Sequence, residues 1–423
     1  MSNVNIKWAS IQPLTGGMYL GAEQAIGHPA EWILSYKGLS DIKKDENGNI
    51  TVAGNEYNLI NYLTKHNRMP KYYQIYNKGM FDTNIYETNP EIRLDDNIEN
   101  PNYEDLDLVV AVPVCSGLSM VTNGSKETKD SKNSNMLWLA YYSLNVIKPK
   151  CYIFENAPTL MGNRGDEIRE QLENIAKEAG YSVLYYKTDT KYHSNCQQRP
   201  RTFVCFFKLN ENTGDEINFE YVNNHINVNK FFSYIKDSYT QMEELESPYH
   251  NTILIDYVKE NIGEDWQTKV YNSLMKFVEK NLSLNDFLDY IKQYNCSDEN
   301  KEKAIKYVEH IIHKRSQGLN YYDCDACLFN KDIFPSVQFR SMQYMLHPSG
   351  KRFCTVREYL ALMGHPTDFE IQGDKSNYPK IGQNVPVKTA KFIVEQAINN
   401  LNNKNNNFTV KVQDNIKFNN NKV

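Results

Sequence analysis

The sequence has no apolar run long enough to cross a membrane, and its N-terminus lacks a basic-then-apolar leader. It also lacks a charge excess, since 47 Lys and Arg stand against 52 Asp and Glu, a formal net charge of −5. A basic excess is typical of nucleic-acid binders, so the total charge gives that class no support. Phosphate contacts need only local Lys and Arg, so the class is not excluded. We expect a cytoplasmic chain that does not contact a membrane.

Cysteine is sparse, with eight residues scattered along 423. This distribution is unlike the framework of a small disulfide-rich secreted protein and predicts reduced thiols. Cys324 and Cys327 form a lone CxxC pair. Because a zinc site of this kind needs a second pair nearby, we predict no metal site.

Hydrophobic residues make up 40% of the chain, which is enough to bury a sizeable core. In the first half, short apolar runs alternate with helical patterns, as in an α/β sheet domain. The expected strands are 6–11, 108–112, 151–154, 182–186 and 202–207. The expected helices between them are 136–146 and 166–179, the second ending at Gly180.

The pattern changes near Lys208, which divides the chain into predicted domains. Residues 209–335 are polar and mostly helical in pattern, so we predict an inserted domain there. Residues 336–401 return to mixed structure and complete the domain begun by residues 1–208. Residues 402–423 are rich in Asn and Lys and are predicted to form a disordered tail.

A loop with a cysteine comes after the predicted strand at 108–112 and contains Pro113, Cys115 and Gly117. Open α/β sheets bind ligands at the carboxyl ends of their strands, which is where Cys115 is expected. Pro and Gly favour a tight loop that can expose a thiol, and a deprotonated thiol is a nucleophile. Taken alone, the same cysteine is explained equally well as a buried core thiol.

Two further polar segments adjoin predicted strands. Glu155 and Asn156 come directly after the strand at 151–154, where a buried carboxyl could donate a proton or simply serve as a loop acid. Gln197, Arg199 and Arg201 lie before the strand at 202–207. Two guanidiniums around a proline suit a phosphate or a base carbonyl, although a solvated surface pair is the alternative.

Glycine-containing segments lie near both ends of the chain. Thr15, Gly16 and Gly17 come after the first predicted strand, where glycines can let a nucleotide-like cofactor approach backbone N–H groups. Near the other end, residues 382–384 precede the last predicted helix. A short amphipathic helix is also expected within 355–366, and packing explains both late segments equally well.

In this order, the segments resemble the motifs of the cytosine-C5 DNA methyltransferases. That family has a glycine-rich loop, a Pro-Cys loop, a Glu-Asn strand end, a Gln-x-Arg-x-Arg segment, a variable target-recognition region, an Arg-Glu helix and a Gly-Asn helix start. Here they appear as Gly16-Gly17, Pro113-x-Cys115, Glu155-Asn156, Gln197-x-Arg199-x-Arg201, Arg357-Glu358 and Gly382-Gln383-Asn384. The resemblance spans residues 1–208 and about 335–400.

The resemblance implies a Rossmann-like class I methyltransferase domain of the α/β class, with a smaller, mainly helical target-recognition domain. It implies S-adenosylmethionine as cofactor and double-stranded DNA as partner of a monomer that is nucleoid-associated, or in the host cytoplasm if phage-encoded. The implied catalytic side chains are Cys115, Glu155, Arg199 and Arg201. The implied cofactor contacts are Thr15, Gly16, Gly17, Leu20, Pro113, Gly382, Gln383 and Asn384. The implied DNA contacts are Ser116, Ser119, Asn156 and Gln197.

The resemblance also implies a reaction that these side chains can perform. Addition of the Cys115 thiolate to carbon 6 of cytosine makes carbon 5 nucleophilic, and Glu155 stabilises charge near ring nitrogen 3. The two arginines would hold the ring carbonyl and a phosphate. Because neither face of a stacked base is accessible, the cytosine must be flipped out, and residues 121–132 would close over it.

Four positions depart from the family pattern. Gln12 and Leu14 replace an aromatic residue and a glycine, Gln383 separates Gly382 from Asn384, and Ser116 replaces a common Gln. In addition, the acidic residue expected after the second strand is not evident in the equivalent region, 32–35. These departures leave three alternatives: a modified one-carbon donor, an inactive homologue that only binds DNA or protein, or a tRNA-directed relative.

Overall fold

The computed structural model describes the chain except for residues 1–4, 37–39, 45–49, 77–104, 115–117, 119–134, 211–213, 320–325, 329–331, 339–341, 374 and 423. It divides into two compact units. Unit 1 comprises Met1–Asn195, Arg199–His225 and Met363–Val423, and unit 2 comprises Cys196–Gln198 and Ile226–Leu362.

These boundaries differ from the predicted 208/209 and 335/336. Residues up to 225 stay with unit 1, because Phe219 packs against Tyr186 and its N–H donates to Gln413. Residues before 363 stay with unit 2, because Leu346 lies in that unit's hydrophobic core. The predicted boundaries came from the change in residue composition along the chain. The observed boundaries depend on which unit each segment packs against.

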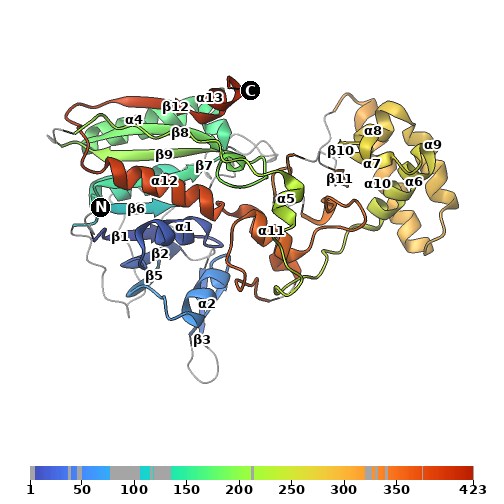
Figure 1. Cartoon of the computed structure of the whole chain (residues 1–423), viewed down its shortest axis with the longest axis horizontal. Coiled ribbons are helices and arrows are strands. Elements are labelled where there is room, and N and C mark those ends of the chain that lie inside the picture. Colours follow the sequence, from blue (N-terminus) through green and yellow to red (C-terminus); the bar gives the residue numbers. More distant parts are fainter. Residues whose placement is uncertain are drawn as a thin grey trace. The chain divides into compact units, whose positions relative to one another are not determined.

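Unit 1 is built on an eight-stranded sheet with the order β12-β8-β9-β7-β6-β1-β2-β5 (Figure 1). The strands are β1 (Trp8–Ile11), β2 (Trp32–Tyr36), β5 (Tyr72–Tyr76), β6 (Leu108–Ala111), β7 (Cys151–Asn156), β8 (Tyr181–Asp189), β9 (Pro200–Lys208) and β12 (Val410–Asp414). All neighbours are parallel except β9, which is antiparallel to both β7 and β8. The five predicted strands and the predicted α/β fold are confirmed.

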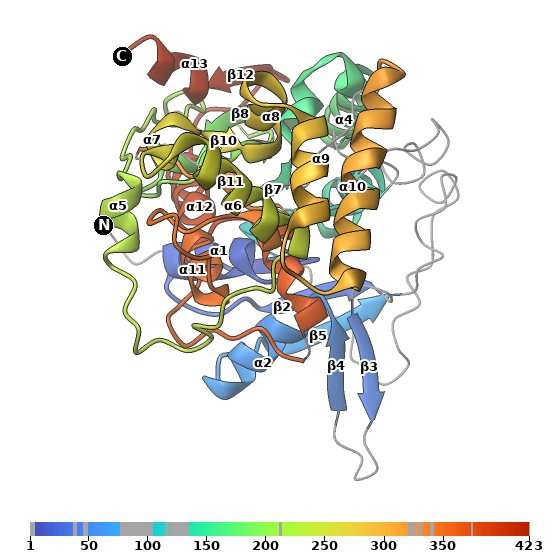
Figure 2. The same ribbon diagram turned by 90° about the vertical axis from the view of Figure 1, so that its right-hand side faces the viewer.

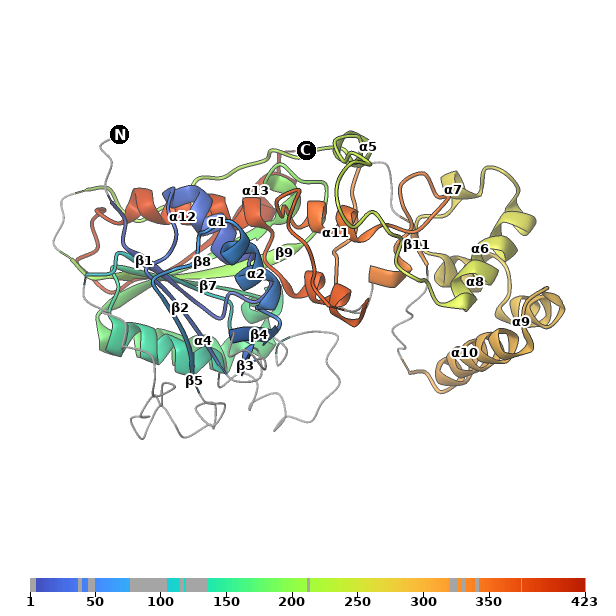
Figure 3. The same cartoon turned by 90° about the horizontal axis from the view of Figure 1, so that it is seen from below.

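The strand order reverses between β1 and β6, so the loops after these two strands open at the position where such sheets bind ligands. Around the sheet, α1 (Gly17–Ile26) and α12 (Val387–Asn400) cover one face, and α4 (Asp166–Ala179) covers the other (Figure 3). On the α4 face a further helix spans 135–142 and continues as η2 (Ser143–Ile147). The helix predicted at 166–179 has those bounds and ends at Gly180, whose φ is 78°.

Shorter elements of unit 1 lie between the strands. They are α2 (Tyr57–Lys65), η3 (Pro158–Met161), η4 (Asn163–Gly165), η5 (Thr190–Tyr192), η7 (Lys375–Gln383) and α13 (Asn415–Asn420). Between β2 and α2, the strands β3 (Ser40–Lys44) and β4 (Ile50–Gly54) form an antiparallel hairpin that extends away from the sheet (Figure 2). The apolar pattern did not predict this hairpin.

The predicted disordered tail is wrong. Residues 410–414 form β12, which pairs with β8 over five residues, and α13 comes directly after it. The Asn-rich composition suggested disorder, but the side chains bind unit 1: Asn405 donates to the Phe207 carbonyl, and Asn415 is fully buried. Hydrogen bonds from buried polar side chains therefore hold this segment on unit 1, whereas apolar burial holds most other elements of the fold.

Unit 2 is mainly helical. Its elements are α5 (Val228–Phe232), α6 (Tyr249–Ile262), α7 (Trp266–Lys269), β10 (Asn272–Ser273), α8 (Leu274–Asn281), α9 (Leu284–Gln293), α10 (Asp298–Ser316), β11 (Cys327–Leu328), η6 (Met342–Tyr344) and α11 (Val356–Leu362). Helices α9 and α10 lie side by side, and Phe287, Ile291, Ala304 and Val308 join one buried core (Figure 2). No helix in the described part of the chain is long and apolar enough to cross a membrane.

The tail can be tested at Asn415. Its amide group donates to Thr188 and to the Val222 carbonyl, and its oxygen accepts from the Val222 N–H and from the side-chain amide of Asn419. Because Asn415→Ala leaves buried groups unsatisfied, we expect it to lower the free energy of unfolding by about 2–4 kcal/mol, measured in urea. The exposed Asn421→Ala is the matched control and should change it by less than about 0.5 kcal/mol. Equal effects of the two substitutions would contradict an ordered tail.

A second prediction concerns acid stability. Burial lowers the pKa of His193 from 6.5 to about 3, so the folded protein holds this ring neutral against the Thr188 hydroxyl. The unfolded chain takes up a proton below pH 6.5, so this stability is present above pH 6.5 and is lost as the pH falls toward 3. We expect His193→Gln to reduce the slope of unfolding free energy against pH between about 6 and 4 by up to about 1.4 kcal/mol per pH unit. The exposed Asn224→Ala, which removes no titratable group, is the control and should leave that slope unchanged.

Candidate functional site

The first and last predicted cofactor segments meet in unit 1. The loop after β1 runs beside the loop after β6, where the Val112 N–H donates to the Ile11 carbonyl at 3.3 Å. From the other end of the chain, the Asn384 Oδ1 accepts from the Gly17 N–H at 2.8 Å, and the Lys380 carbonyl accepts from the Thr15 hydroxyl at 3.2 Å. The structure thus brings together segments from the two ends of the sequence.

The glycines of this loop are needed by the chain's own packing. A Cβ added to Gly17 would lie 1.7 Å from the Val385 carbonyl oxygen, and one added to Gly16 would lie 2.6 Å from Leu59. Gly16 also has φ 95°, a left-handed conformation that suits glycine. Leu20, predicted as a cofactor contact, lies on α1 and is buried. The glycines alone therefore do not identify a ligand.

The departures from the family pattern have a physical account in the backbone. Gln12 and Leu14 both have φ 51°, in the left-handed region, so Leu14 keeps a conformation that a glycine adopts easily. A non-glycine residue there costs roughly 1–2 kcal/mol, which the surrounding packing must offset. The loop therefore makes its left-handed turns without glycine at these two positions.

The structure also places Gln383, Asn384 and residues 32–35. Gln383 is exposed, and its oxygen accepts from the Asn55 amide at 3.2 Å, whereas Asn384 reaches the start of α1. Residues 32–35, taken as the region after the second strand, lie within β2 itself. Residues 37–39, directly after β2, lie outside the described residues.

The predicted nucleophile Cys115, with Ser116 and Ser119, lies outside the described residues, as does the predicted lid at 121–132. Neighbouring residues are anchored. The Val114 N–H donates to the Asn135 side chain at 2.8 Å. The buried Leu118 accepts from the Thr159 hydroxyl through its carbonyl. Pro113 is buried at the carboxyl end of β6.

Glu155 and Arg201 form an ion pair at this same edge of the sheet. Glu155 is on β7 and is 5% exposed, and the Arg201 Nε lies 2.7 Å from its Oε1. The pair forms because β9 runs antiparallel to β7, which places the start of β9 beside the end of β7. Arg201 also donates from Nη1 to the Pro200 carbonyl. The carboxylate is thus held in a fixed orientation next to the strand that leads to Cys115.

Arg199, predicted to hold the base or a phosphate, binds backbone carbonyls of the chain itself in this structure. Its guanidinium is buried and donates from Nη2 to the carbonyls of Gly382 and Asn384, at 3.1 and 2.7 Å. Its N–H donates to Asp189, a buried carboxylate whose pKa is raised by burial. These bonds join the residue directly before β9 to the segment before α12, so Arg199 stabilises the position of two of the residues predicted to contact the cofactor.

The predicted DNA contacts Asn156 and Gln197 are both buried. In unit 2 the Gln197 amide donates to the Leu362 carbonyl and accepts from the Val337 N–H. The Asn156 oxygen accepts from the Ala157 N–H. A polar residue near a strand end can serve the chain itself rather than a ligand, and sequence does not distinguish the two.

Sequence reasoning missed two supporting side chains, Asp189 and His365. Asp189 accepts from the Arg199 N–H where β8 meets β9, and His365 contacts the Asn384 amide. Asn135 did carry a signal, because the stretch 134–137 also fits the family pattern at the end of the expected catalytic loop, and its side chain accepts from the Val114 N–H.

The buried cysteines among the described residues are poor nucleophiles. Burial raises the pKa of the thiols of Cys151, Cys196, Cys205 and Cys354. Cys324, one half of the CxxC pair, lies outside the described residues. The residues that the structure describes contain no group of three or more His, Cys, Asp or Glu side chains that could hold a metal ion.

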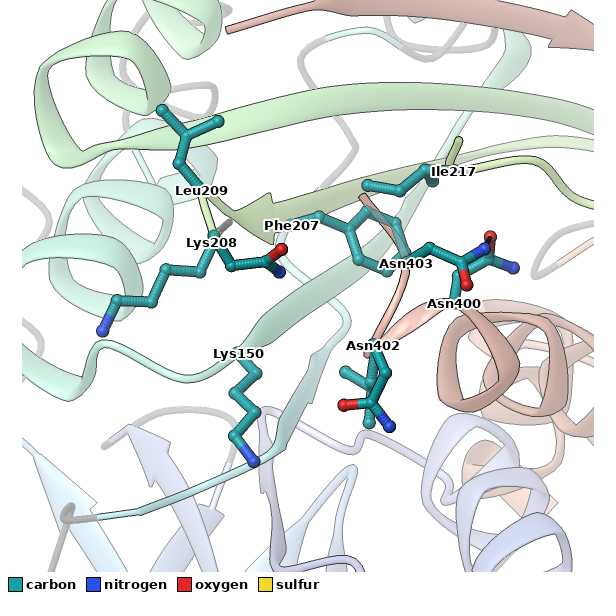
Figure 4. Close-up of a pocket in the computed structure, with 10 residues that line it drawn as sticks. Lys150, Phe207, Lys208, Leu209, Ile217, Asn400, Asn402 and Asn403 are labelled. Carbon is teal, nitrogen blue, oxygen red and sulfur yellow. Dashed lines mark hydrogen bonds between the residues drawn. The ribbon is translucent and has the colours of Figure 1, made fainter. Parts of the chain in front are cut away.

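A cavity of about 340 Å³ lies elsewhere in unit 1 (Figure 4). Its lining includes Lys150, Lys208 and Asn402, from the start of β7, the end of β9 and the segment after α12. Because Cys151 pairs with Phe207, these strand ends form the edge of the sheet opposite Glu155. The residues that line this cavity include none of the predicted site residues that the structure describes.

Comparisons with known proteins give a family. A family model described as C-5 cytosine-specific DNA methylase matches residues 57–399. The chain is 24% identical to Type II methyltransferase M.Bpa9945I of Bacillus paralicheniformis, over 66% of this chain and 67% of that protein. It is 21% identical to Type II methyltransferase M1.HphI of Haemophilus parahaemolyticus, over 78% of each. The family match begins after the glycine loop, the segment that departs most from the pattern.

Solved structures support the fold. A DNA modification methyltransferase encoded within an E. coli prophage matches with a TM-score of 0.51 and 16% identity, over 94% of this chain and 99% of that one. The methyltransferase EhMeth of Entamoeba histolytica matches with the same TM-score and coverage at 11% identity. At these identities the similarity concerns the fold alone.

The Glu155–Arg201 pair can be tested by a double-mutant cycle. Because both groups are largely buried, we expect Glu155→Gln and Arg201→Leu to couple by about 1–3 kcal/mol in unfolding free energy, measured in urea. The exposed Lys391–Glu395 pair on α12, with a separation of 3.0 Å, is the control. Lys391→Leu and Glu395→Gln should couple by no more than about 0.5 kcal/mol. Coupling of the same size in both pairs would show that Glu155 and Arg201 are not held together.

Proposed function

The chain belongs to the C-5 cytosine-specific DNA methylase family, and we propose that it methylates carbon 5 of a flipped-out cytosine through a covalent bond to Cys115. The observation that supports this best is the buried Glu155–Arg201 pair at the carboxyl edge of β7, the neighbour of the strand that leads to Cys115. A protein that only bound DNA would have no need of a carboxylate oriented at this edge.

In this proposal, Cys115 attacks carbon 6 of the cytosine as a thiolate. The electron pair moves toward ring nitrogen 3, which takes a proton from the Glu155 carboxyl group in its protonated form, and carbon 5 becomes the nucleophile. After methyl transfer, a solvent molecule acting as base takes the proton from carbon 5, nitrogen 3 returns its proton to Glu155, and Cys115 leaves as a thiolate, which restores the aromatic ring. Arg201 acts through Glu155 by holding its carboxylate, and Arg199 holds the segment before α12.

S-adenosylmethionine is the methyl donor that the family uses and would supply an electrophilic methyl group when bound. The residues present fit it, because the loop between β1 and α1 keeps the left-handed turns of a glycine loop at the sheet's switch point. The positive end of the α1 helix dipole, whose first N–H is held by the Asn384 side chain, suits the donor's carboxylate.

Unit 2 is proposed to recognise the target sequence in double-stranded DNA. The two relatives named Type II methyltransferases suggest that the modification protects DNA from a restriction enzyme. The enzyme is proposed to act as a monomer close to the DNA that it modifies.

The covalent step can be tested with duplex DNA in which cytosine is replaced by 5-fluorocytosine. Fluorine at carbon 5 cannot leave as a proton does, so the adduct with Cys115 accumulates when S-adenosylmethionine is added. We expect a DNA–protein band on a denaturing gel with the wild-type protein and no band with Cys115→Ser. The half-buried Cys296→Ser is the matched control and should form the adduct.

Each other outcome selects an alternative. Absence of an adduct in the wild-type protein across a random-sequence duplex pool would favour an inactive homologue that only binds. An adduct whose base carries a one-carbon group other than methyl, shown by mass spectrometry, would favour a modified donor. Adducts with 5-fluorocytosine in tRNA rather than in DNA would favour a tRNA-directed enzyme.

A further inference from the structure

We propose that His365 is a positioning residue for the cofactor loop: its neutral ring accepts a hydrogen bond from Asn384, and Asn384 in turn holds the start of α1. The inference rests on the proposed function only for the identity of the ligand that the loop binds. The contacts themselves belong to the chain, and all of them lie in unit 1.

The orientation of the Asn384 side chain is fixed by the backbone. Its Oδ1 accepts from the Gly17 N–H at 2.8 Å and from the Val385 N–H at 3.0 Å. A backbone N–H can only donate, so the oxygen must face these two groups and the amide nitrogen must face away. That nitrogen contacts the Nε2 atom of His365.

This geometry determines the state of the His365 ring. An amide NH2 group donates only, so Nε2 must accept and the ring must be neutral, with its proton on Nδ1. A phenylalanine in place of His365 would leave the Asn384 amide without this buried acceptor. The Asn384 side chain would then turn toward another acceptor and release the Gly17 N–H.

The ring is held in place independently of Asn384. His365 is 6% exposed and stacks on Phe369, with ring centroids 4.3 Å apart and planes at 29°. Phe369 packs against Tyr62 of α2 at 5.2 Å. This stack keeps Nε2 directed at Asn384 without requiring that bond. The ring and its acceptor atom can therefore be tested separately.

Asn384 is also bonded to Arg199, which lies next to the strand that carries Arg201, the partner of Glu155. The Asn384 carbonyl accepts from Arg199, and its side chain reaches Gly17 and His365. A shift of the Asn384 side chain would therefore act on the loop that binds the cofactor before it acts on Cys115 or Glu155. We expect a substitution at His365 to weaken cofactor binding while the chemical step at saturating cofactor is unchanged.

The test compares His365→Phe, which keeps a stacking ring and loses the acceptor, with His365→Gln, which keeps an acceptor oxygen and loses the ring. We expect His365→Phe to raise the Kd of S-adenosylmethionine about tenfold in calorimetry, with kcat at saturation within about twofold. His365→Gln should restore most of the affinity. The matched control is His66→Phe, since His66 packs on the same Tyr62 and lies outside the hydrogen bonds of Asn384.

A second readout does not depend on the ligand. Hydrogen exchange of the Gly17 amide in the free protein should be about tenfold faster in His365→Phe than in the wild type and in His66→Phe. Because His365 acts through Asn384, adding His365→Phe to Asn384→Ala should cause no further change in Kd or exchange.

The outcomes separate this inference from the proposed function. If the wild-type protein binds no S-adenosylmethionine, the proposed donor is wrong, and the exchange rates still decide the role of His365. If His365→Phe matches the wild type in both measurements, or if Phe and Gln are equally damaging, the positioning role is wrong. A fall in kcat with an unchanged Kd would also overturn it.

Discussion

The hydrogen bond from the Gly17 N–H to the Asn384 side chain joins the two segments that are proposed to bind the cofactor. It fixes the start of α1 against the segment before α12. The close packing of these two helices, with Gly21 against Ala390, then leaves no room for a larger residue at Gly21. Because the bond spans 367 positions of sequence, the loop after β1 is shaped by residues from the far end of the chain.

The antiparallel strand β9 gives the other side of the site its shape. Its reversed direction brings Arg201 to the end of β7 and Arg199 to the carbonyls of Gly382 and Asn384. One short segment thus contacts both the carboxylate proposed to act on the base and the segment proposed to act on the donor. Asp189 secures this segment at the end of β8 through the Arg199 N–H.

Much of the fold could be predicted from local patterns. Five strands and the helix at 166–179 were predicted from apolar runs and from Gly180, because these signals lie within or beside the element itself. The tail could not be predicted, because its asparagines suggest a solvated segment until the partners on β8 and β9 are known. For the same reason Asn156 and Gln197 were predicted as ligand contacts, whereas the structure buries both and bonds them to the chain itself.

The sequence by itself determined which side chains are present and in what order: Glu155, the Arg199–Arg201 pair and the loop with Cys115, and hence the family. It also determined the α/β class, since the period of the apolar residues sets strand and helix. Only the tertiary structure decided which arginine donates to backbone carbonyls and which one pairs with the Glu155 carboxylate. The physical reason is that Arg199 and Arg201 are chemically identical, and only the direction and burial of each side chain assign one to Glu155 and the other to backbone carbonyls.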